Sequence, residues 1–435
     1  MYYNSINNKL NIKKFSNVFF SNIPKNKTLF FPFKIPILRN KYIHNLKKMN
    51  YLNFSFEISK LFLDSISEED LYNVLYKSYN LKKIVKLEDL DINNNYLLNL
   101  NNGPTLTFKD IAMIPLSNLL NFFSLKNNKK NIIFCATSGD TGSAANNSFK
   151  NIYNSKIFTF YPFNMISNIQ RKQITTLQSK NIFNYSIIGN FDFTQHFVKK
   201  IFENIKNNKK ISLISVNSIN WFRIIMQLIY YCYISIKNNN YEKLDFIIPS
   251  GNFGNALSAF LAKKMGFPIG KIISCTNDNF YLDNYIKNNK IENLMLKKTI
   301  CPSIDISIPS NFIRLVDKNL FKKKNINNIN NNIYSDKMYN KNIINSIEYF
   351  YQKFNKIYDP HTIISLSSLF KENLKNQIAV STSYPIKFIF SIKKIIPNIK
   401  IKTNIKNLFF LKENYKIFSQ NFLVLINSIK KNINV

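Results

Sequence analysis

Glycine is scarce in this chain, and the places where it remains constrain the fold more than any other feature. The 435 residues include 8 glycines, whereas roughly 30 would be typical at this length. Because glycine alone tolerates left-handed backbone conformations and very close contacts, the remaining glycines are expected where no side chain fits. Five of them lie in three short loops, at Gly103, Gly139, Gly142, Gly251 and Gly254. These loops are therefore the first candidates for a functional site.

Lysine dominates the charge of the chain. The 60 Lys and Arg against 24 Asp and Glu give a formal net charge of +36, and only 4 of the basic residues are arginine. Such an excess is typical of proteins that bind nucleic acids or anionic membranes. Here Lys, Asn and Ile are abundant in every region, including the expected core, so drift in composition explains the charge better than a selected surface. We expect no nucleic-acid or membrane partner, and a basic nucleic-acid-binding protein stays a less favoured alternative.

The apolar and cysteine patterns indicate a cytoplasmic protein. The first residues, MYYNSINNKLNIKKF, lack the apolar block of a secretory signal. The most apolar segment, residues 221–236, is interrupted by Arg223 and Gln227, which predicts a buried helix rather than a membrane span. The 4 cysteines have no CxxC spacing, as expected of reduced core thiols. The 3 histidines give little support to a metal site, and we expect none.

Between about residues 95 and 275 the chain shows repeated strand–loop–helix units. Residues 131–136 and 244–248 are short apolar runs typical of buried strands, and each precedes a glycine-containing turn. Helices are expected from Ser143 and over 256–265, the second ended by Gly266. Strands alternating with helices predict an α/β fold with parallel sheets covered on both faces and ligands at the carboxyl ends of the strands. The Asn-rich stretch 325–332 is expected to be a solvated loop.

The loop PSGNFGN, residues 249–255, lies between a predicted strand and a predicted helix. Its two glycines let successive backbone N–H groups converge at the positive end of the helix, which suits a phosphate. The loop TSGDTG, residues 137–142, has the same layout and suits a carboxylate or a phosphate. Each loop could instead be an ordinary turn, with Thr137 or Ser138 serving only as a helix cap.

The third loop leads to a lysine. In NGPTLTFKD, residues 102–110, Gly103-Pro104 forces a turn and Lys109 follows just before a predicted helix. A lysine between Phe108 and Asp110 could be desolvated, which lowers the pKa of its amine and frees it for Schiff-base chemistry. Composition alone does not single out Lys109, because most of the chain's many lysines are expected to be solvated.

Taken together, four segments resemble the threonine synthase family, which comprises pyridoxal-phosphate enzymes of fold type II. They are NGPTLTFKD, CATSGDTGSAA, SVNSINWFR and IPSGNFGNALSAFLAKKMGFPI. Further segments resemble the family in the same order, namely NKTLFFPFKIP, CPSIDISIPSNFIRLV, DPHTII and STSYPIKF. The resemblance implies two α/β domains with mainly parallel sheets flanked by helices. It also implies an N-terminal subdomain over 1–90 and a catalytic core over 91–435, with a smaller mobile subdomain at about 125–213.

The resemblance also assigns residues to roles. It implies that Lys109 holds pyridoxal 5'-phosphate as a Schiff base and moves protons during catalysis, and that Thr382 meets the pyridine nitrogen of the cofactor. The cofactor's phosphate would be bound by Gly251, Asn252, Phe253, Gly254 and Asn255. The carboxylate of the amino-acid substrate would be bound by Thr137, Ser138, Gly139, Asp140 and Thr141. The phosphate of the substrate, O-phospho-L-homoserine, would be bound by Asn217, Ser218, Asn220 and Arg223.

The implied activity is conversion of O-phospho-L-homoserine and water into L-threonine and phosphate. The nearest alternative is another fold type II lyase, such as a serine/threonine dehydratase, which needs no second phosphate site. Asn102, Phe280 and Tyr384 stand where the family commonly has His, Asp and His, which leaves the effect on activity open. The sequence does not distinguish a monomer from a homodimer.

Overall fold

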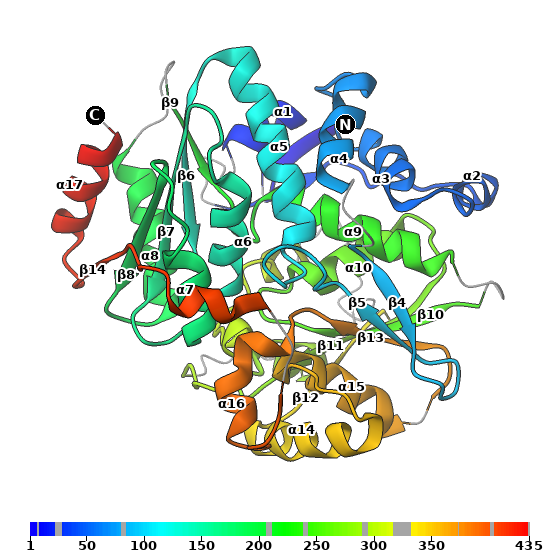
Figure 1. Cartoon of the computed structure of the whole chain (residues 1–435). Helices are drawn as coiled ribbons and strands as arrows, with labels where there is room; N and C mark the ends of the chain where they lie inside the picture. Colours follow the sequence, from blue (N-terminus) through cyan, green and yellow to red (C-terminus); the bar gives the residue numbers. More distant parts are fainter. Residues whose placement is uncertain are drawn as a thin grey trace.

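The computed structural model describes the whole chain except residues 7, 22–27, 80–83, 206–210, 238–241, 289–294, 316–331, 373, 401–403 and 434–435. Two sheets lie next to each other, each with its own helices, and the N-terminal helices pack at one end (Figure 1). The strands are β1 Tyr2–Ser5, β2 Asn8–Lys14, β3 Phe30–Pro32, β4 Lys86–Asp89, β5 Tyr96–Asn99, β6 Lys130–Ala136, β7 Ser155–Pro162, β8 Ile182–Ile187, β9 Ile211–Ser215, β10 Leu244–Pro249, β11 Ile269–Thr276, β12 Ile333–Lys337, β13 Gln377–Ser381 and β14 Lys416–Phe418.

The α-helices are α1 Phe15–Ser21, α2 Asn40–Leu46, α3 Tyr51–Lys60, α4 Glu68–Tyr79, α5 Asp110–Asn127, α6 Asp140–Phe149, α7 Asn168–Thr175, α8 Phe191–Asn204, α9 Trp221–Ser235, α10 Gly254–Lys264, α11 Tyr281–Asn288, α12 Phe312–Leu315, α14 Asn340–Phe354, α15 Pro360–Glu372, α16 Ile389–Lys393 and α17 Phe422–Ile433. Short 3-10 helices are η1 Pro302–Ile304, η2 Pro385–Phe388 and η3 Asn404–Phe409.

The larger sheet has the strand order β12-β11-β10-β13-β5-β4 and is parallel except for the antiparallel edge strand β4. The second sheet has the order β14-β8-β7-β6-β9 and is parallel throughout. A small antiparallel sheet, β2-β1-β3, belongs to the N-terminal region. The predicted α/β class with mainly parallel sheets is therefore confirmed.

Alternation along the strands explains why both faces of each sheet are covered. In β6, Ile132 and Phe134 join the apolar cluster that α8 and α17 complete, whereas Ile133 and Cys135 face α6. Successive side chains of a strand point to opposite faces, so a strand covered by helices on both sides must be apolar throughout. This pattern marks β6 as a central strand already in the sequence.

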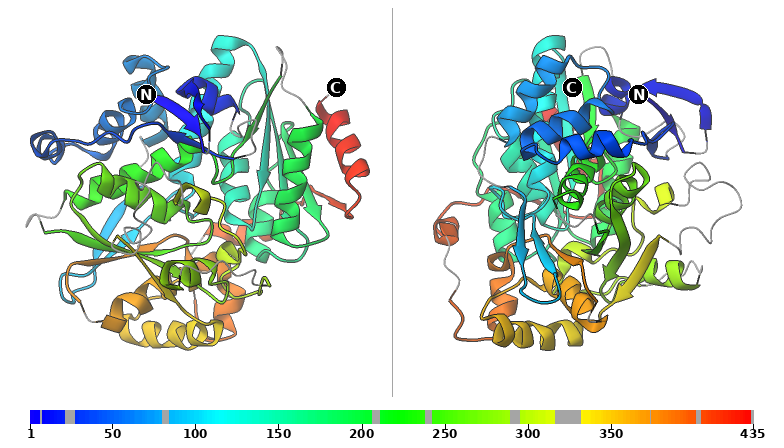
Figure 2. Two further views of the ribbon diagram at one scale, coloured as in Figure 1. Left: turned by 180° about the vertical axis from the view of Figure 1, so that it is seen from behind. Right: turned by 90° about the vertical axis from the view of Figure 1, so that its right-hand side faces the viewer.

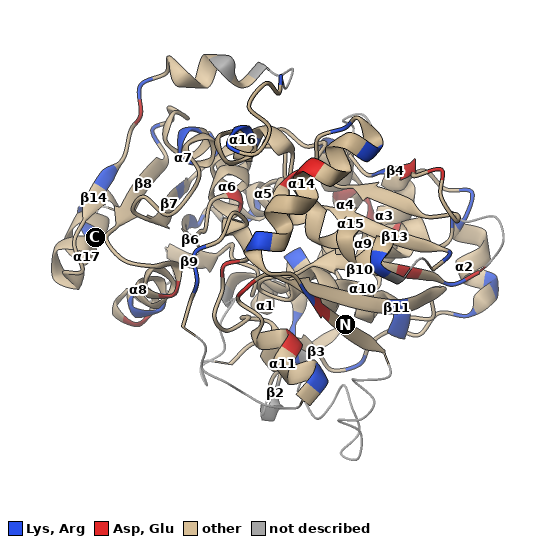
Figure 3. Ribbon diagram, turned by 90° about the horizontal axis from the view of Figure 1, so that it is seen from below, with Lys and Arg blue, Asp and Glu red and all other residues tan. Residues whose placement is uncertain are grey.

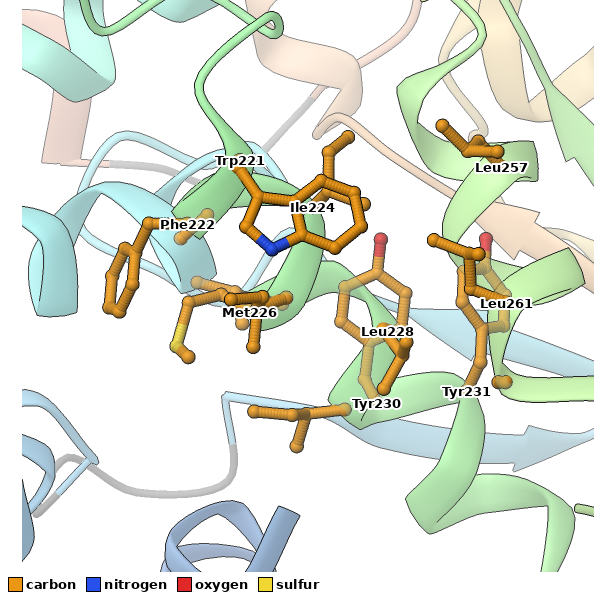
Figure 4. Close-up of a cluster of buried hydrophobic side chains, with 14 of the residues drawn as sticks. Trp221, Phe222, Ile224, Met226, Leu228, Tyr230, Tyr231, Leu257 and Leu261 are labelled. Atoms are coloured by element: carbon orange, nitrogen blue, oxygen red, sulfur yellow. The ribbon is translucent and has the colours of Figure 1, made fainter. Parts of the chain in front are cut away.

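Helix α9 is the center of the main hydrophobic core, and the prediction that it is a buried helix is confirmed. Almost every residue from Trp221 to Ser235 is buried. Trp221, Tyr230 and Tyr231 belong to the same cluster of buried side chains as Leu257 and Leu261 of α10 (Figure 4). No helix within the described ranges is both long and apolar enough to cross a membrane.

The buried Arg314 connects the N-terminal region to the core. Its guanidinium donates hydrogen bonds to the carbonyl oxygens of Phe30 at 3.1 Å and Ile219 at 2.7 Å, and lies over the Trp221 ring at 5.4 Å. Burial lowers the pKa of Arg314 to about 9. This retained arginine therefore fixes the segment that precedes α9.

The loops singled out in the sequence all follow carboxyl ends of parallel strands. Residues 102–109 follow β5, Thr382 follows β13 and residues 250–255 follow β10, three strands of the larger sheet. Residues 137–142 follow β6 and residues 216–220 follow β9, which are neighbours in the second sheet. In the larger sheet the strand order changes direction between β10 and β13, and in the second sheet it changes direction between β6 and β9. Such topological switch points are where α/β proteins bind ligands.

Most predicted elements are confirmed, but two helices begin earlier than predicted, one of them α10, at Gly254 rather than at Ala256. The strands over 131–136 and 244–248 exist, and Gly266, with φ of +101°, directly follows the end of the helix predicted over 256–265. Helix α6 begins at Asp140 rather than at Ser143, so Gly142 is helical. Gly142 is required there because a Cβ atom would lie 2.6 Å from the Thr137 methyl group. The loop predicted over 325–332 lies outside the described residues except for Asn332.

Two features bear on the remaining predictions. The last strand and helix, β14 and α17, join the second sheet although they are far from it in the sequence (Figure 2). Lys and Arg lie on widely separated elements, including α11, α16 and β14, rather than on one face (Figure 3). The second observation gives no support to a nucleic-acid-binding surface.

We expect Gly139→Ala to destabilise the chain by about 1–3 kcal/mol. Gly139 has φ of +125°, and an added Cβ would lie 2.4 Å from the Gln170 side chain. Gly254→Ala is the control, because Gly254 has no positive φ and its nearest atoms lie 3.3 Å away. Urea unfolding of the cofactor-free chain measures both changes, and equal losses would contradict the strain argument.

Candidate active site

The loops at the strand ends line one cleft. The space between its walls, including the part open to solvent, is about 700 Å³. Lys109 and the loop after β10 both line this cleft. The lining residues are Phe108, Lys109, Ala136, Ser138, Asp140, Thr141, Phe191, Asn217, Ser218, Arg223, Gln227, Pro249, Ser250, Gly251, Asn252, Phe253, Gly254, Asn255, Ser303, Ile304, His361 and Thr382.

Lys109 has the environment of a reactive amine. It directly precedes α5, and its side chain is 13% exposed. Its Nζ lies 3.6 Å from Asp140 Oδ2 and 4.5 Å from the center of the Phe108 ring. Burial lowers the pKa of Lys109 to about 8, opposed by Asp140 and assisted by the positive charges of Arg223 and Lys387. Near pH 8 a large fraction of Lys109 is therefore neutral and nucleophilic.

Asp140 lies at the center of a buried polar network. Its Oδ1 is 2.7 Å from Lys387 Nζ and accepts a hydrogen bond of 2.8 Å from Gln170 Nε2. Its Oδ2 accepts from the hydroxyls of Thr107 at 3.3 Å and Ser383 at 3.2 Å. These partners hold the pKa of Asp140 far below its usual range despite burial, chiefly through the positive charges of Lys387 and Lys109. Asp140 is thus a fixed anion in the wall of the cleft.

The loop after β10, residues 250–255, leads directly into α10 and is called the cup below. Phe253 has a left-handed conformation with φ of 61° and is buried, and α10 begins at Gly254. The Oδ1 atom of Asn255 accepts hydrogen bonds from the hydroxyls of Tyr230 and, at 2.8 Å, Tyr231. Because the oxygen is occupied, the Asn255 amide group is left as a donor at the cup. The positive end of α10 adds to this anion-binding character.

Several buried polar atoms of the cleft wall have no hydrogen-bond partner among the described residues. They are Arg223 Nε, Gln227 Oε1, Ser250 Oγ, Asn255 Nδ2 and His361 Nε2. A buried polar atom without a partner costs roughly 1–3 kcal/mol, so native proteins keep few of them. Their concentration in one cleft indicates that a polar ligand supplies the missing partners.

Some predicted site residues lie behind the cleft wall. Thr137 Oγ1 accepts from the backbone N–H groups of Gly139 at 2.9 Å and Gly142 at 2.8 Å, so Thr137 stabilises its own loop. Asn220 caps α9 by accepting from the N–H of Phe222 at 3.0 Å. Asn217 lines the cleft, but its amide bridges the backbone of Ala136 at 3.0 and 2.6 Å.

Ser138, Thr141 and Ser218 line the cleft, as do Arg223 and Thr382. Arg223 is fully buried, and its Nη1 donates to the carbonyl oxygen of Val216 at 2.8 Å. Burial lowers the pKa of Arg223 to about 10. The Val216 contact orients the guanidinium, so its free Nε has a fixed direction.

Two features of the site were not predicted from the sequence. Lys387 and Gln170 hold Asp140. Lys387 lies in the family-like segment STSYPIKF, but no role was predicted for its side chain. His361 also lines the cleft, with its Nδ1 held 2.8 Å from the buried Asp359 carboxylate. The Asp-x-His spacing in DPHTII was a usable signal, because a carboxylate that holds one ring nitrogen directs the other outward.

The three departures from the family pattern lie in different surroundings. Asn102 is exposed and donates to the Asn99 carbonyl oxygen at 3.2 Å. The Phe280 ring packs under Lys337, whose Nζ lies 4.3 Å from the ring center. Tyr384 precedes η2 and is partly buried. Among these three, none lines the cleft described above.

Comparison with known proteins agrees with this geometry. Residues 2–79 match the family described as "Threonine synthase N terminus". The chain is 32% identical over 421 residues to threonine synthase from Saccharomyces cerevisiae, covering 83% of this chain and 82% of the relative. It is 34% identical over 307 residues to threonine synthase from Pseudomonas aeruginosa, covering 69% of this chain and 65% of that protein.

The structure also matches the crystal structure titled "PLP bound Threonine synthase" from Brucella melitensis, with a TM-score of 0.90, 26% identity and all of both chains covered. The fold and the cleft therefore define a pyridoxal-phosphate-dependent enzyme of fold type II. Within that class, the chain belongs to the threonine synthase family.

The residues of the cleft fit pyridoxal phosphate. Ser250 Oγ and Asn255 Nδ2 are unpartnered hydrogen-bonding groups beside the cup, where the cofactor's phosphate would find donors. Lys109 supplies an amine that can form a Schiff base with the aldehyde of the cofactor. Thr382, directly after β13, supplies a hydroxyl.

Replacing Ser250 tests whether the cup binds the cofactor. We expect Ser250→Ala to weaken pyridoxal phosphate binding about tenfold, because one hydrogen bond to a charged group is lost. Ser274→Ala is a matched control: Ser274 Oγ is also buried and unpartnered, but Ser274 does not line the cleft. Fluorescence titration of the cofactor-free chain gives both affinities. Similar losses in the two variants would contradict this use of Ser250.

Proposed function

We propose that this chain converts O-phospho-L-homoserine and water into L-threonine and phosphate. The observation that best supports the proposal is one cleft that contains a low-pKa lysine, a phosphate cup and a separate buried arginine with a free donor. The cofactor's phosphate needs one anion site, and a phosphorylated amino acid needs another. The family relationship makes this substrate the natural choice.

In this proposal the cofactor is bound at its two ends. Lys109 holds it covalently, and residues 251–255 with Ser250 bind its phosphate. Thr382 would face the ring nitrogen with a neutral hydroxyl, a partner that does not require that nitrogen to be protonated. The bound cofactor supplies an electron sink for the electron pair left when the substrate's α-proton is removed.

The substrate is oriented by its two anionic groups. The side chains of Ser138 and Thr141 and the amides at the start of α6 receive the carboxylate, aided by the positive end of that helix. Asp140, being a fixed anion, would repel a carboxylate directly and acts instead on Lys109. Ser218 and Arg223 bind the substrate's phosphate, and Asn217 and Asn220 hold the segment that presents them.

Lys109 is the acid and base of the reaction in this proposal. Its amine, neutral near pH 8, takes the proton from Cα and moves a proton at Cβ. Phosphate leaves from Cγ, and Cγ takes up a proton to become the methyl group. Water then adds its hydroxyl at Cβ, and a proton returns to Cα. A group with a pKa near the working pH both accepts and returns protons efficiently, which an ordinary lysine does not.

The domain boundaries predicted from the sequence remain a proposal: 1–90, 91–435 and a mobile part at about 125–213. The separate apolar cluster between the second sheet and helices α8 and α17 supports a unit that moves as one body. Its motion would exclude water from the cleft. We also propose a cytoplasmic location, because all four cysteines are buried and free.

A serine/threonine dehydratase is the second candidate, and product analysis separates the two. We expect the purified chain with pyridoxal phosphate to release equal amounts of phosphate and threonine from O-phospho-L-homoserine. It should release little 2-oxobutanoate from L-threonine. The reverse pattern would favour the dehydratase.

Arg223→Lys tests the second anion site. We expect kcat/KM for O-phospho-L-homoserine to fall at least about tenfold, since lysine lacks the planar fork that binds phosphate with two parallel hydrogen bonds. The cofactor's visible absorbance should persist, because Arg223 is not assigned to the cofactor. Unchanged kcat/KM would remove Arg223 from the substrate site.

A further inference from the structure

Two buried lysines share one carboxylate in this site. Lys387 is completely buried, and its Nζ lies 2.7 Å from Asp140 Oδ1. The same Nζ donates to the Thr105 carbonyl oxygen at 2.9 Å. Lys109 Nζ is farther from Asp140, 3.6 Å from Oδ2. Asp140 is therefore the direct partner of Lys387 and a weaker partner of Lys109.

Three other ionisable groups lie near Lys109, and none of them replaces Lys387 as the direct partner of Asp140. Arg223 faces Lys109 from α9 and adds a positive charge. Asp110, at the start of α5, accepts hydrogen bonds from the Thr105 N–H at 2.9 Å and hydroxyl at 2.6 Å. Burial raises the pKa of Asp110 to about 6, and its hydrogen bonds are directed toward Thr105. His361 lines the same cleft, with its ring held by Asp359.

We propose that Lys387 is a positioning residue that neutralises Asp140 and thereby leaves the amine of Lys109 free to react. The inference rests on the proposed role of Lys109 as the residue that binds the cofactor. Without Lys387, the fixed carboxylate would pair with Lys109 and hold it as an ammonium ion. With Lys387 present, a proton on Lys109 adds a positive charge to a site whose anion is already neutralised.

The protonation state of Lys109 matters because only its neutral amine can form the Schiff base with the cofactor. The Nζ lone pair forms the new N–C bond to the aldehyde carbon of the cofactor. Both amine protons end on the aldehyde oxygen, which leaves as water, so no oxidant or reductant is required. An ammonium ion has no lone pair for this step.

The proposal predicts that replacing Lys387 and replacing Asp140 shift the deprotonation midpoint of Lys109 in opposite directions. Lys387→Met removes a positive charge and leaves Asp140 to pair with Lys109, so the midpoint of Lys109 deprotonation moves to higher pH. Asp140→Asn removes the negative charge, so the midpoint moves to lower pH. Lys387→Arg keeps the charge and leaves the midpoint close to that of the wild type.

Trace acetylation measures that midpoint without using catalysis. The full chain is freed of cofactor and treated with dilute acetic anhydride between about pH 6 and about pH 11. Peptide mass spectrometry then gives the acetylation of Lys109 at each pH. Near pH 8 we expect acetylation in Lys387→Met to be at least about tenfold slower than in the wild type, because an opposite charge at this distance shifts a pKa by one unit or more.

Lys263→Met is the matched control for loss of a partly buried lysine. Lys263 Nζ donates to the Gly270 carbonyl oxygen at 2.6 Å, outside the cleft, so its loss should leave the Lys109 midpoint unchanged. Circular dichroism and Trp221 fluorescence show whether each variant is folded. If Lys387→Met does not fold, Asp140→Asn and Lys387→Arg decide the question.

The outcomes separate this inference from the proposed function. A wild-type midpoint at about pH 10.4, the value of an ordinary solvated lysine, would remove the reactive-amine role of Lys109 and the proposed function with it. A low wild-type midpoint that Lys387→Met does not raise, or that Asp140→Asn does not lower, would overturn only the inference about Lys387.

Discussion

The carboxylate of Asp140 connects parts of the chain that are far apart in the sequence. It contacts Lys109 before α5, Gln170 on α7, and Ser383 and Lys387 after β13. Asp140 itself lies on the second sheet's side of the cleft, while Lys109 and Lys387 belong to segments that follow strands of the larger sheet. One buried anion thus links the two sheets at the reactive amine. A buried charge is tolerated only when its partners satisfy it fully, and here several donors do so.

The cleft also contains polar atoms that the protein itself does not satisfy. Burying Arg223 Nε, Asn255 Nδ2 and Ser250 Oγ without partners lowers stability. Left-handed Phe253 in the cup adds backbone strain of the kind that active sites often contain. The unpartnered polar atoms and the strained residue all lie at the cleft, where the cofactor and substrate would bind. The binding groups are therefore held in place before the ligand binds, and the cost is a lower stability of the protein.

Much of this architecture could be predicted from the sequence, because local patterns determine it. The apolar runs of β6 and β10 identify central strands, and the retained glycines mark their turns. The family resemblance then placed Lys109 and residues 251–255 on functional loops, and both line one cleft. The start of α6 was misplaced because Gly142 suggested a turn, whereas it is required inside the helix by contact with Thr137.

The contacts of Asp140 could not be predicted, because they depend on tertiary structure. Lys387 lies in the family-like segment STSYPIKF, but its contact with Asp140 follows only from the tertiary structure, in which it is completely buried 2.7 Å from that carboxylate. The capping role of Asn220 was similarly hidden, since the same residue type also suits a ligand. For Thr137 the sequence had left a capping role open beside the ligand role, and its contacts match the former.

The central claim is that Lys109 is the amine that holds the cofactor in this cleft. Borohydride reduction of the chain loaded with pyridoxal phosphate, followed by peptide mapping, tests it most directly. The account predicts a visible absorption band that disappears on reduction, with the cofactor's mass fixed to the peptide that contains Lys109. A colourless protein, or the cofactor fixed to a different lysine, would contradict it.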